Sequence, residues 1–208
     1  IPPSEQGISY IMVDLYKNFA APLTHDTLFD WHLNLMNSRA DLNFIGNYRQ
    51  HADPMQIISG AAAKLKVHYE APPSGRMPEE MGRYVQWFNT SAALPALTRA
   101  GIAHLYFELI HPFEDGNGRI GRAIAEKSIS QSIKEPLLLA SSKIIQKTKK
   151  QYYAALAANN NNLEITDWLV YFANTMLAAQ DYTKKYIEFL AAKTKLYDRI
   201  KDQINERQ

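Results

Sequence analysis

Residues 111–122, HPFEDGNGRIGR, bring together side chains that could transfer a phosphate-containing group. A neutral imidazole at His111 could take a proton from an incoming hydroxyl. Asp115 supplies a hard oxygen ligand of the kind that Mg²⁺ prefers. Arg119 and Arg122 are three positions apart, so on a helix both guanidinium groups could bind the same polyphosphate. The segment therefore predicts a phosphate-binding site that includes a base and a magnesium ligand.

Two helices must position these side chains, one before the segment and one after it. Apolar residues at helical spacing mark them, at Ile102, Leu105, Tyr106, Leu109 and Ile110 before the loop and at Ile124, Ile129 and Ile133 after it. Pro112 ends the first helix because it lacks an N–H and its ring clashes with the preceding turn. Gly116 and Gly118 allow a tight loop. We expect the second helix to open near Gly118, where its unpaired N–H groups form an anion site.

Each of these residues also has a simpler interpretation. A histidine near the end of an apolar helix is more often structural than catalytic. The residues Asp-Gly-Asn-Gly at 115–118 usually form a turn, and a calcium loop is excluded because no further acidic residues follow at alternate positions. Two arginines three positions apart normally form a solvated face. All of these would have to coincide within a dozen positions, which favours the functional interpretation.

The segment matches the signature HPFx[D/E]GNGRxxR at every specified position, and on this signature the chain resembles the Fic family. The resemblance implies a mainly α-helical bundle with one small β-hairpin, called the flap. It also implies an enzyme that moves AMP from ATP to a Ser, Thr or Tyr hydroxyl of a target protein, with Mg²⁺ as cofactor. His111 would be the base and Asp115 the metal ligand, and phosphate would bind to Gly116, Asn117, Gly118, Arg119 and Arg122.

Before the signature, the helical period disappears from Gly46 to Pro78. Two short segments there, 55–59 and 65–69, are rich in β-branched and aromatic residues and predict a hairpin, with an irregular loop as the alternative. By resemblance this hairpin is the flap, which docks the target by strand addition. The docking residues would be Gln56, Ile57, Ile58 and Ser59.

After the signature helix, a basic helix capped by Ser141 or Ser142 is expected, followed by an aromatic one. By resemblance, Tyr153 and Asn160 line the adenosine pocket. Core packing for Tyr153 and a helix cap for Asn160 are equally open interpretations. One helix should then begin at Thr166, and a separate amphipathic helix should end the chain.

Composition is typical of a globular enzyme domain. The 208 residues are 46% hydrophobic and 21% charged, with a net charge of +2 and no cysteine. We expect a single domain over 1–208, with a Fic-like core at about 42–177, in the cytoplasm and without membrane contact. Nucleic acid is an improbable partner at this charge. Since the chain does not begin with Met, we expect a fragment or a processed protein.

Regulation and rival functions stay open. Many Fic proteins carry an inhibitory helix with the pattern [S/T]xxxE[G/N], which this sequence lacks. We therefore expect an upstream segment or a separate partner, such as an antitoxin, to supply it; a homodimer is a further option. Rival donors would carry UMP, phosphocholine or phosphate, although Gly118 favours a nucleotide, since phosphate-transferring relatives often carry Lys there. A nucleotide-binding adaptor is a rival function of a different class, and so is a regulator whose DNA-binding part lies beyond Gln208.

Overall fold

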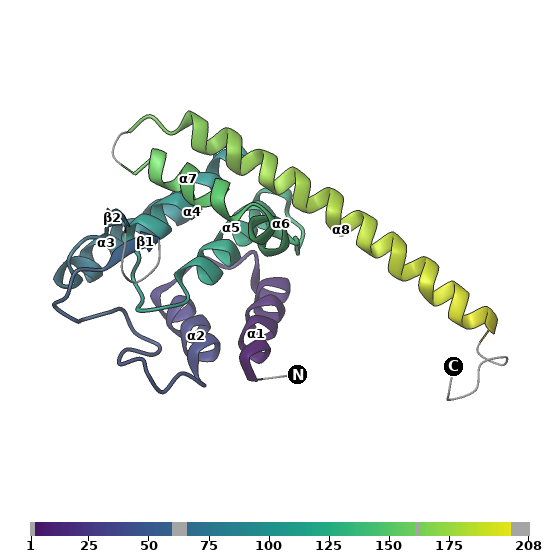
Figure 1. The fold of residues 1–208 in the computed structure, drawn as a ribbon, viewed down its shortest axis with the longest axis horizontal. Helices are drawn as coiled ribbons and strands as arrows, with labels where there is room; N and C mark the ends of the chain where they lie inside the picture. The colour runs from purple at the N-terminus through teal and green to yellow at the C-terminus, as the bar shows by residue number, and fades with distance from the viewer. Residues whose placement is uncertain (1–2, 60–65, 161–162, 201–208) are drawn as a thin grey trace.

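A computed structural model describes residues 3–59, 66–160 and 163–200, and helices dominate it (Figure 1). The expectation of a mainly α-helical fold with one small hairpin is confirmed. In chain order the elements are α1 (Pro3–Asn18), α2 (His25–Met36), β1 (Gln56–Ser59), β2 (Lys66–Glu70), the 3₁₀ turn η1 (Ser74–Arg76), α3 (Met77–Thr90), α4 (Ala96–Ile110), α5 (Asn117–Ile133), α6 (Ser141–Lys147), α7 (Lys149–Ala158) and α8 (Thr166–Ile200).

Helices α4 and α5 form the centre of the fold. The short loop 111–116 joins them, so they pack as antiparallel neighbours. Apolar residues lie all around α4, as expected of a helix buried on every side. One apolar cluster packs α1, α2 and α3 against this pair, and a second packs α6, α7 and α8 against it. The signature segment is therefore held between two cores.

Local signals account for several helix boundaries. From the sequence, Thr24 after Pro22 predicts an N-cap for the helix that follows, and the structure confirms it, because the hydroxyl of Thr24 accepts the N–H of Thr27 at 3.1 Å. The sequence also predicts that Pro78 lies in the first turn of a helix, and it does so in α3. Neither Ser141 nor Ser142 caps α6, because Ala140 takes the N-cap position and both serines lie inside the helix; that prediction was wrong. The two prolines in residues 1–4 predict an extended entry to the chain, which was wrong at Pro3, where α1 already begins.

Strands β1 and β2 pair antiparallel, which confirms the predicted hairpin strands. Gln56 lies opposite Glu70, and the register shifts between Ile57 and Ile58, as at a β-bulge. The N–H of Ala71 donates to Met55 O at 2.8 Å and extends the pairing past β2. Residues 60–65 and the side chains of 57–59 lie outside the described structure, so the docking role of this segment stays a prediction.

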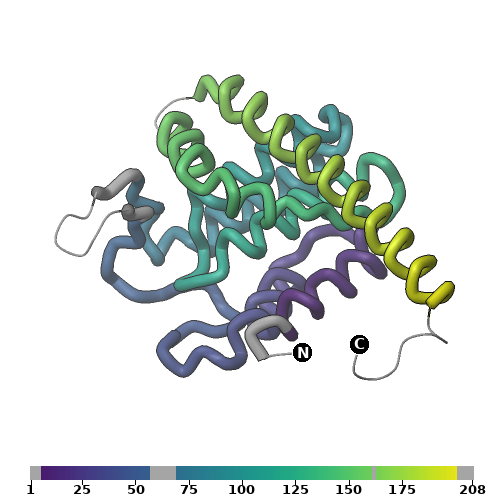
Figure 2. Tube along the Cα trace, turned by 45° about the vertical axis from the view of Figure 1, so that its right-hand side comes forward, coloured from purple at the N-terminus to yellow at the C-terminus, as the bar shows by residue number. Residues whose placement is uncertain are grey.

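The C-terminal region differs from the sequence-based expectation of two helices. Residues 166–200 form the single helix α8. Its buried residues all lie in the first half, at Trp168, Phe172, Thr175, Met176 and Ala179. The second half extends away from the other helices in both views (Figures 1 and 2). Across the described residues, none of the helices combines the length and apolar character needed to cross a bilayer.

Candidate active site

The signature loop is anchored by Phe113 and Asn117. Phe113 is fully buried, and its ring stacks on that of His32 at 4.1 Å. The buried Asn117 amide accepts the N–H of Phe113 at 3.0 Å and donates to its carbonyl at 2.8 Å. The Asn117 side chain therefore braces the loop, and its contact with phosphate stays a prediction.

His111 is the C-cap of α4 and adopts a left-handed conformation, with φ 49° and ψ 59°. Its Nδ1 lies 3.1 Å from the carbonyl oxygen of Glu108. A carbonyl only accepts, so Nδ1 carries the proton and Nε2 keeps a lone pair. Burial lowers the pKa of His111, the Glu108 carbonyl opposes that shift, and the charge of Arg49 adds to it. The imidazole is thus held neutral, as a general base requires.

The N-terminus of α5 and two arginines form a positive region beside His111. Helix α5 begins at Asn117, close to the predicted start, and its first N–H groups have no partner within the helix. Gly116 is the N-cap and has a positive φ of 84°. Arg119 lies 3.4 Å from Asp115, and Nε of Arg122 donates to Ser142 Oγ at 2.8 Å. The charges and dipoles here favour a bound anion.

Asp115 is surrounded by donors. Its Oδ2 accepts Nη1 of Arg39 and its Oδ1 accepts the N–H of Gly116, each at 2.5 Å. Burial raises the pKa of Asp115, but Gly116, Arg39 and Arg119 together outweigh burial and hold it below its ordinary value. The carboxyl group is therefore charged at neutral pH.

The donor set around Asp115 fits magnesium bound together with a nucleotide. Within the described residues, no group of three or more His, Cys, Asp or Glu side chains could hold a metal by itself. Mg²⁺ needs no such cluster, since one or two carboxylates, water and substrate phosphates commonly complete its shell. A lone, half-exposed carboxylate at the mouth of a phosphate site meets that requirement.

One cavity of about 400 Å³ brings most of the predicted residues together. The residues that line it and were predicted from the sequence are Gln56, His111, Asp115, Gly116, Asn117, Gly118, Arg119, Arg122 and Tyr153. Tyr153 is 41% exposed, so its ring is not a core residue. Asn160 is not one of the described residues that line the cavity. Its role at the adenosine pocket stays a prediction.

Glu108 is a cavity residue that the sequence analysis missed. It is 5% exposed, and burial raises its pKa to about 7 while the charge of Arg122 opposes that rise. Its Oε1 has no hydrogen-bond partner among the described residues. A Cβ at Gly121 would come within 2.8 Å of this oxygen, so a larger residue there would force the Glu108 carboxyl group to move. Spacing offered one signal, because Glu108 lies one helical turn before His111.

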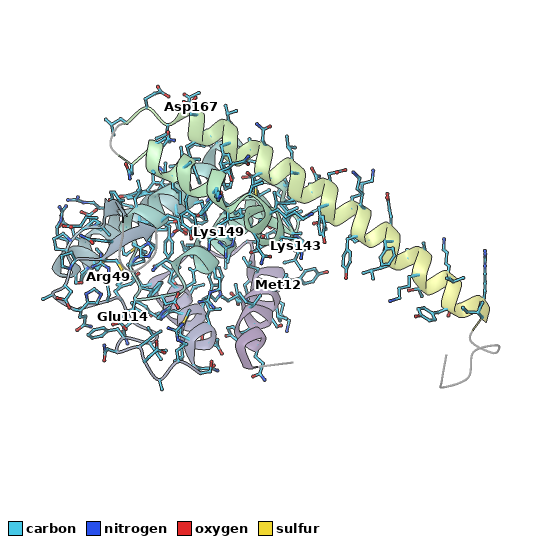
Figure 3. All side chains as sticks on the ribbon, in the orientation of Figure 1. Met12, Arg49, Glu114, Lys143, Lys149 and Asp167 are labelled. Atoms are coloured by element: carbon cyan, nitrogen blue, oxygen red, sulfur yellow. The ribbon has the colours of Figure 1, made fainter. Side chains whose placement is uncertain are left out.

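Three further contacts to the loop come from the segment between α2 and β1. Arg39 binds Asp115, Arg49 donates to His111 O at 2.8 Å, and the N–H groups of residues 43 and 44 donate to Glu114 Oε2 at 2.7 and 2.9 Å. Figure 3 labels Arg49 and Glu114 on the same side of the molecule. These partners are more than 60 positions apart, so no local pattern could have predicted them.

A second cavity, of about 380 Å³, meets the first at Arg119 and Arg122. Apolar residues of α1 form one wall, and Lys143 of α6 lies on the other. Met12 and Lys143, both labelled in Figure 3, mark these two walls. We call this cavity the α1–α6 groove. It gives the two arginines a second open side.

Comparisons with known sequences place this site in a family. A sequence model of the Fic/DOC family matches residues 22–128, just over half of the chain. A probable protein adenylyltransferase from Aquifex aeolicus is 36% identical over 56 residues, which are 27% of this chain and 18% of the relative. The protein adenylyltransferase fic-1 of Caenorhabditis elegans is 32% identical over 92 residues, 43% of this chain and 18% of the relative. The matched segments thus span under a fifth of these relatives.

Solved structures share the fold. A Fic family protein from Desulfovibrio desulfuricans superposes with a TM-score of 0.69 at 25% identity, covering 88% of this chain and 55% of the other. Fic-1 from C. elegans superposes with a TM-score of 0.66 at 22% identity, covering 89% of this chain and 52% of the other. This chain spans about half of each. With the signature loop, its cavity and the family match in agreement, the chain belongs to the Fic/DOC family.

Proposed function

We propose that this chain transfers AMP from ATP to a Ser, Thr or Tyr hydroxyl of a target protein and releases pyrophosphate. Relatives in A. aeolicus and C. elegans carry the name protein adenylyltransferase. The observation that carries the proposal is the placement of His111. Its Nδ1 is bonded to Glu108 O, and the ring lines the same cavity as the N-terminus of α5 and both arginines.

In the proposed reaction, Nε2 of His111 accepts the proton of the target hydroxyl while the hydroxyl oxygen bonds to the α-phosphorus. The bond from the α-phosphorus to the oxygen that bridges to the β-phosphorus breaks, and pyrophosphate leaves with its electron pair. N–H groups in the first turn of α5 would bind the α-phosphate oxygens, where negative charge develops. His111 then gives its proton to solvent. A positioned base of this kind contributes about 10²–10⁴-fold.

Asp115 is the residue that we propose holds Mg²⁺. The ion would neutralise phosphate charge and orient the α- and β-phosphates. Arg119 and Arg122 would bind the β- and γ-phosphates and stabilise the charge of the departing pyrophosphate. Both line the cavity with Asp115, and the Ser142 hydroxyl orients the Arg122 guanidinium.

Two residues that line the cavity, Tyr153 and Gln56, fit the donor and the target. The half-exposed ring of Tyr153 offers a stacking surface for adenine, with Asn160 proposed nearby. Gln56, at the start of β1, also lines the cavity. We propose that an extended target segment adds to this strand through main-chain hydrogen bonds, which would demand little of its sequence.

The α1–α6 groove suits the inhibitory partner that the family resemblance implies. It joins an apolar wall to Arg119 and Arg122, so an amphipathic helix could bury its apolar face there and present a carboxylate to the arginines. Such a helix would compete with the γ-phosphate for Arg122. We propose this occupant for the groove, supplied by an upstream segment or a separate chain.

The function is tested by incubating the chain with Mg²⁺, α-labelled ATP and a protein lysate. Wild-type protein should label a target or itself, and intact mass spectrometry should show the mass of one AMP. His111→Ala should bind ATP as wild type does but transfer no label. The matched control is His51→Ala, which should transfer normally, because in the described structure His51 does not line the cavity and its Nδ1 bonds to Asp53 O.

Further outcomes separate the rival functions. Label from UTP or from a phosphocholine donor, but none from ATP, would assign a different donor to the same site. ATP binding without transfer from any donor would indicate a nucleotide-binding adaptor. Transfer by His111→Ala at the wild-type rate would refute the proposal that His111 is the general base.

A further inference from the structure

Arg49 is a buried arginine that connects three parts of the site. It is 1% exposed, and Nε donates to His111 O at 2.8 Å. Nη1 donates to Ser74 Oγ at 2.8 Å, and Nη2 donates to Pro72 O at 2.5 Å and Ile110 O at 3.4 Å. The acceptors belong to the end of α4 and to the segment that follows β2. The guanidinium therefore joins the signature loop to the base of the hairpin.

The backbone of His111 needs such a support. A non-glycine residue with φ of 49° is in a conformation that costs free energy, and it persists only where surrounding contacts fix it. The N–H of His111 donates to Phe107 O at 3.0 Å, and its carbonyl accepts Arg49. The N–H of Arg49 also donates to Pro112 O at 2.9 Å. Arg49 thus holds the chain at His111 and at the next residue.

We propose that Arg49 is a positioning residue that fixes the imidazole of His111 in the cavity and couples it to the base of the target-docking hairpin. The catalytic consequence of this inference rests on the proposed transfer reaction. The positioning itself does not, since it follows from the buried hydrogen bonds.

The planar fork of arginine suits this position. A guanidinium has five N–H donors in fixed directions, whereas a lysine ammonium is a compact charge on a single stem. Arg49→Lys keeps the positive charge but cannot reach the carbonyls of residues 72 and 111 and the Ser74 hydroxyl together. The substitution therefore separates geometry from charge.

Arg99 provides a matched control at the other end of α4. It is 2% exposed, and within the part of the chain that the structure describes it too donates only to neutral oxygens, those of Phe88, Ser91, Ser128 and Gln131. Arg99→Lys should perturb packing as Arg49→Lys does, but far from His111. An effect seen only for Arg49→Lys is then an effect on the site and not a general loss of stability.

The experiment records the ¹⁵N resonances of the His111 ring in wild type and both lysine variants, together with ATP affinity and transfer rate. Wild type and Arg99→Lys should show the Nδ1–H tautomer, and Arg49→Lys should show a mixture. For Arg49→Lys, the transfer rate should fall about 10²-fold, as expected for a reacting group displaced by about 1 Å, with ATP affinity within about twofold of wild type. Arg99→Lys should transfer at the wild-type rate per folded molecule.

Identical His111 spectra in folded Arg49→Lys and Arg99→Lys would overturn the proposal. If Arg49→Lys does not fold, Ser74→Ala removes one hydrogen bond from the fork and should shift the tautomer in the same direction by a smaller amount; no shift there would overturn it as well. A wild-type chain that transfers no nucleotide, while Arg49→Lys still disturbs His111, would refute the proposed function and leave the positioning role standing.

Discussion

Arg39 and Asp115 are 76 positions apart in the sequence, and Nη1 of Arg39 donates to Oδ2 of Asp115 at 2.5 Å. Arg39 is itself held by Asp41, through a two-bond fork with both distances at 2.7 Å. The Asp41 carboxylate thus orients the Arg39 guanidinium toward Asp115, the residue proposed to bind Mg²⁺. Arg39 and Mg²⁺ would therefore compete for the carboxylate of Asp115.

We therefore expect Arg39→Ala to lower the Mg²⁺ concentration needed for half-maximal ATP binding. Both side chains of the Arg39–Asp115 pair are 40% exposed, and exposed pairs of this kind are weak, so the decrease should be no more than about fivefold. Titration of fluorescent ATP at a series of Mg²⁺ concentrations measures it. Arg83→Ala, which breaks an exposed pair with Glu79 on α3, is the control. A higher Mg²⁺ requirement in Arg39→Ala would show that Arg39 supports the metal.

The pH dependence of the transfer rate should reflect the pKa of His111, the proposed base. Burial and Arg49 keep the pKa of His111 below its ordinary value of 6.5, although the Glu108 carbonyl and Asp115 act in the opposite direction. Since the neutral ring is the active form, the acid midpoint of the rate should lie below pH 6.5, with the rate declining as pH falls through that midpoint. Initial rates of label transfer between pH 5 and 9 would show this. An acid midpoint at or above pH 6.5 would contradict it.

Sequence patterns predicted what local chemistry determines. The signature loop, the Thr24 cap and the start of α5 follow from residues within a few positions of one another. The contacts of Arg39 and Arg49 depend on how distant segments pack, and no local pattern encodes them. The cavity could be predicted in part, through the residues that the signature itself contains.

The prediction of two helices at the C-terminus was wrong for a different reason. Two apolar stripes, one ending at Leu177 and one beginning at Tyr186, predicted two separate helices. Residues 166–200 instead form one helix, and the sequence of α8 contains no Gly or Pro that would end it. Its second half has exposed apolar side chains, among them Tyr186, Phe189 and Leu196. The spacing of apolar residues shows which face of a helix packs against the core, but it does not show where the helix ends. A helix such as α8 that extends beyond the core can therefore lose its regular apolar spacing and still continue.

Glu108→Gln should make stability depend differently on pH. Between pH 4.5 and about 7 the folded chain holds a proton on Glu108 that the unfolded chain has released. The contribution of this group to stability is thus complete below pH 4.5 and lost as pH rises through 7. Glutamine is neutral throughout, so the variant should be about 1–3 kcal/mol more stable than wild type at pH 8.

This advantage should shrink towards zero at pH 5. Urea unfolding at both pH values measures it. Glu79→Gln, on the exposed face of α3, should change stability by less than about 0.5 kcal/mol at either pH and serves as the control. An equal effect of Glu108→Gln at both pH values would show that Glu108 is ionised in the folded chain across this range.

Gly116→Ala should destabilise the fold and weaken nucleotide binding together. The φ of 84° at this position costs a residue with a Cβ about 1–2 kcal/mol, and that Cβ would lie 2.5 Å from Cε of Met36 and 3.2 Å from Cδ2 of Leu35. Relief of these contacts must shift the buried side chains of Met36 and Leu35 or the N-cap of α5, where phosphate is proposed to bind. The expected loss of stability is about 2–4 kcal/mol, measured by urea unfolding, with weaker ATP affinity alongside.

Gly82→Ala is the matched control for this substitution. Gly82 lies within α3, and a Cβ there would have no atom within 4 Å. Alanine should therefore stabilise the helix by about 0.5–1 kcal/mol, because it loses less backbone entropy on folding than glycine does, and ATP affinity should not change. The two glycines thus predict stability changes of opposite sign from the same chemical change. If Gly116→Ala were as stable as Gly82→Ala and bound ATP equally well, the left-handed N-cap at Gly116 would not be needed for the phosphate site.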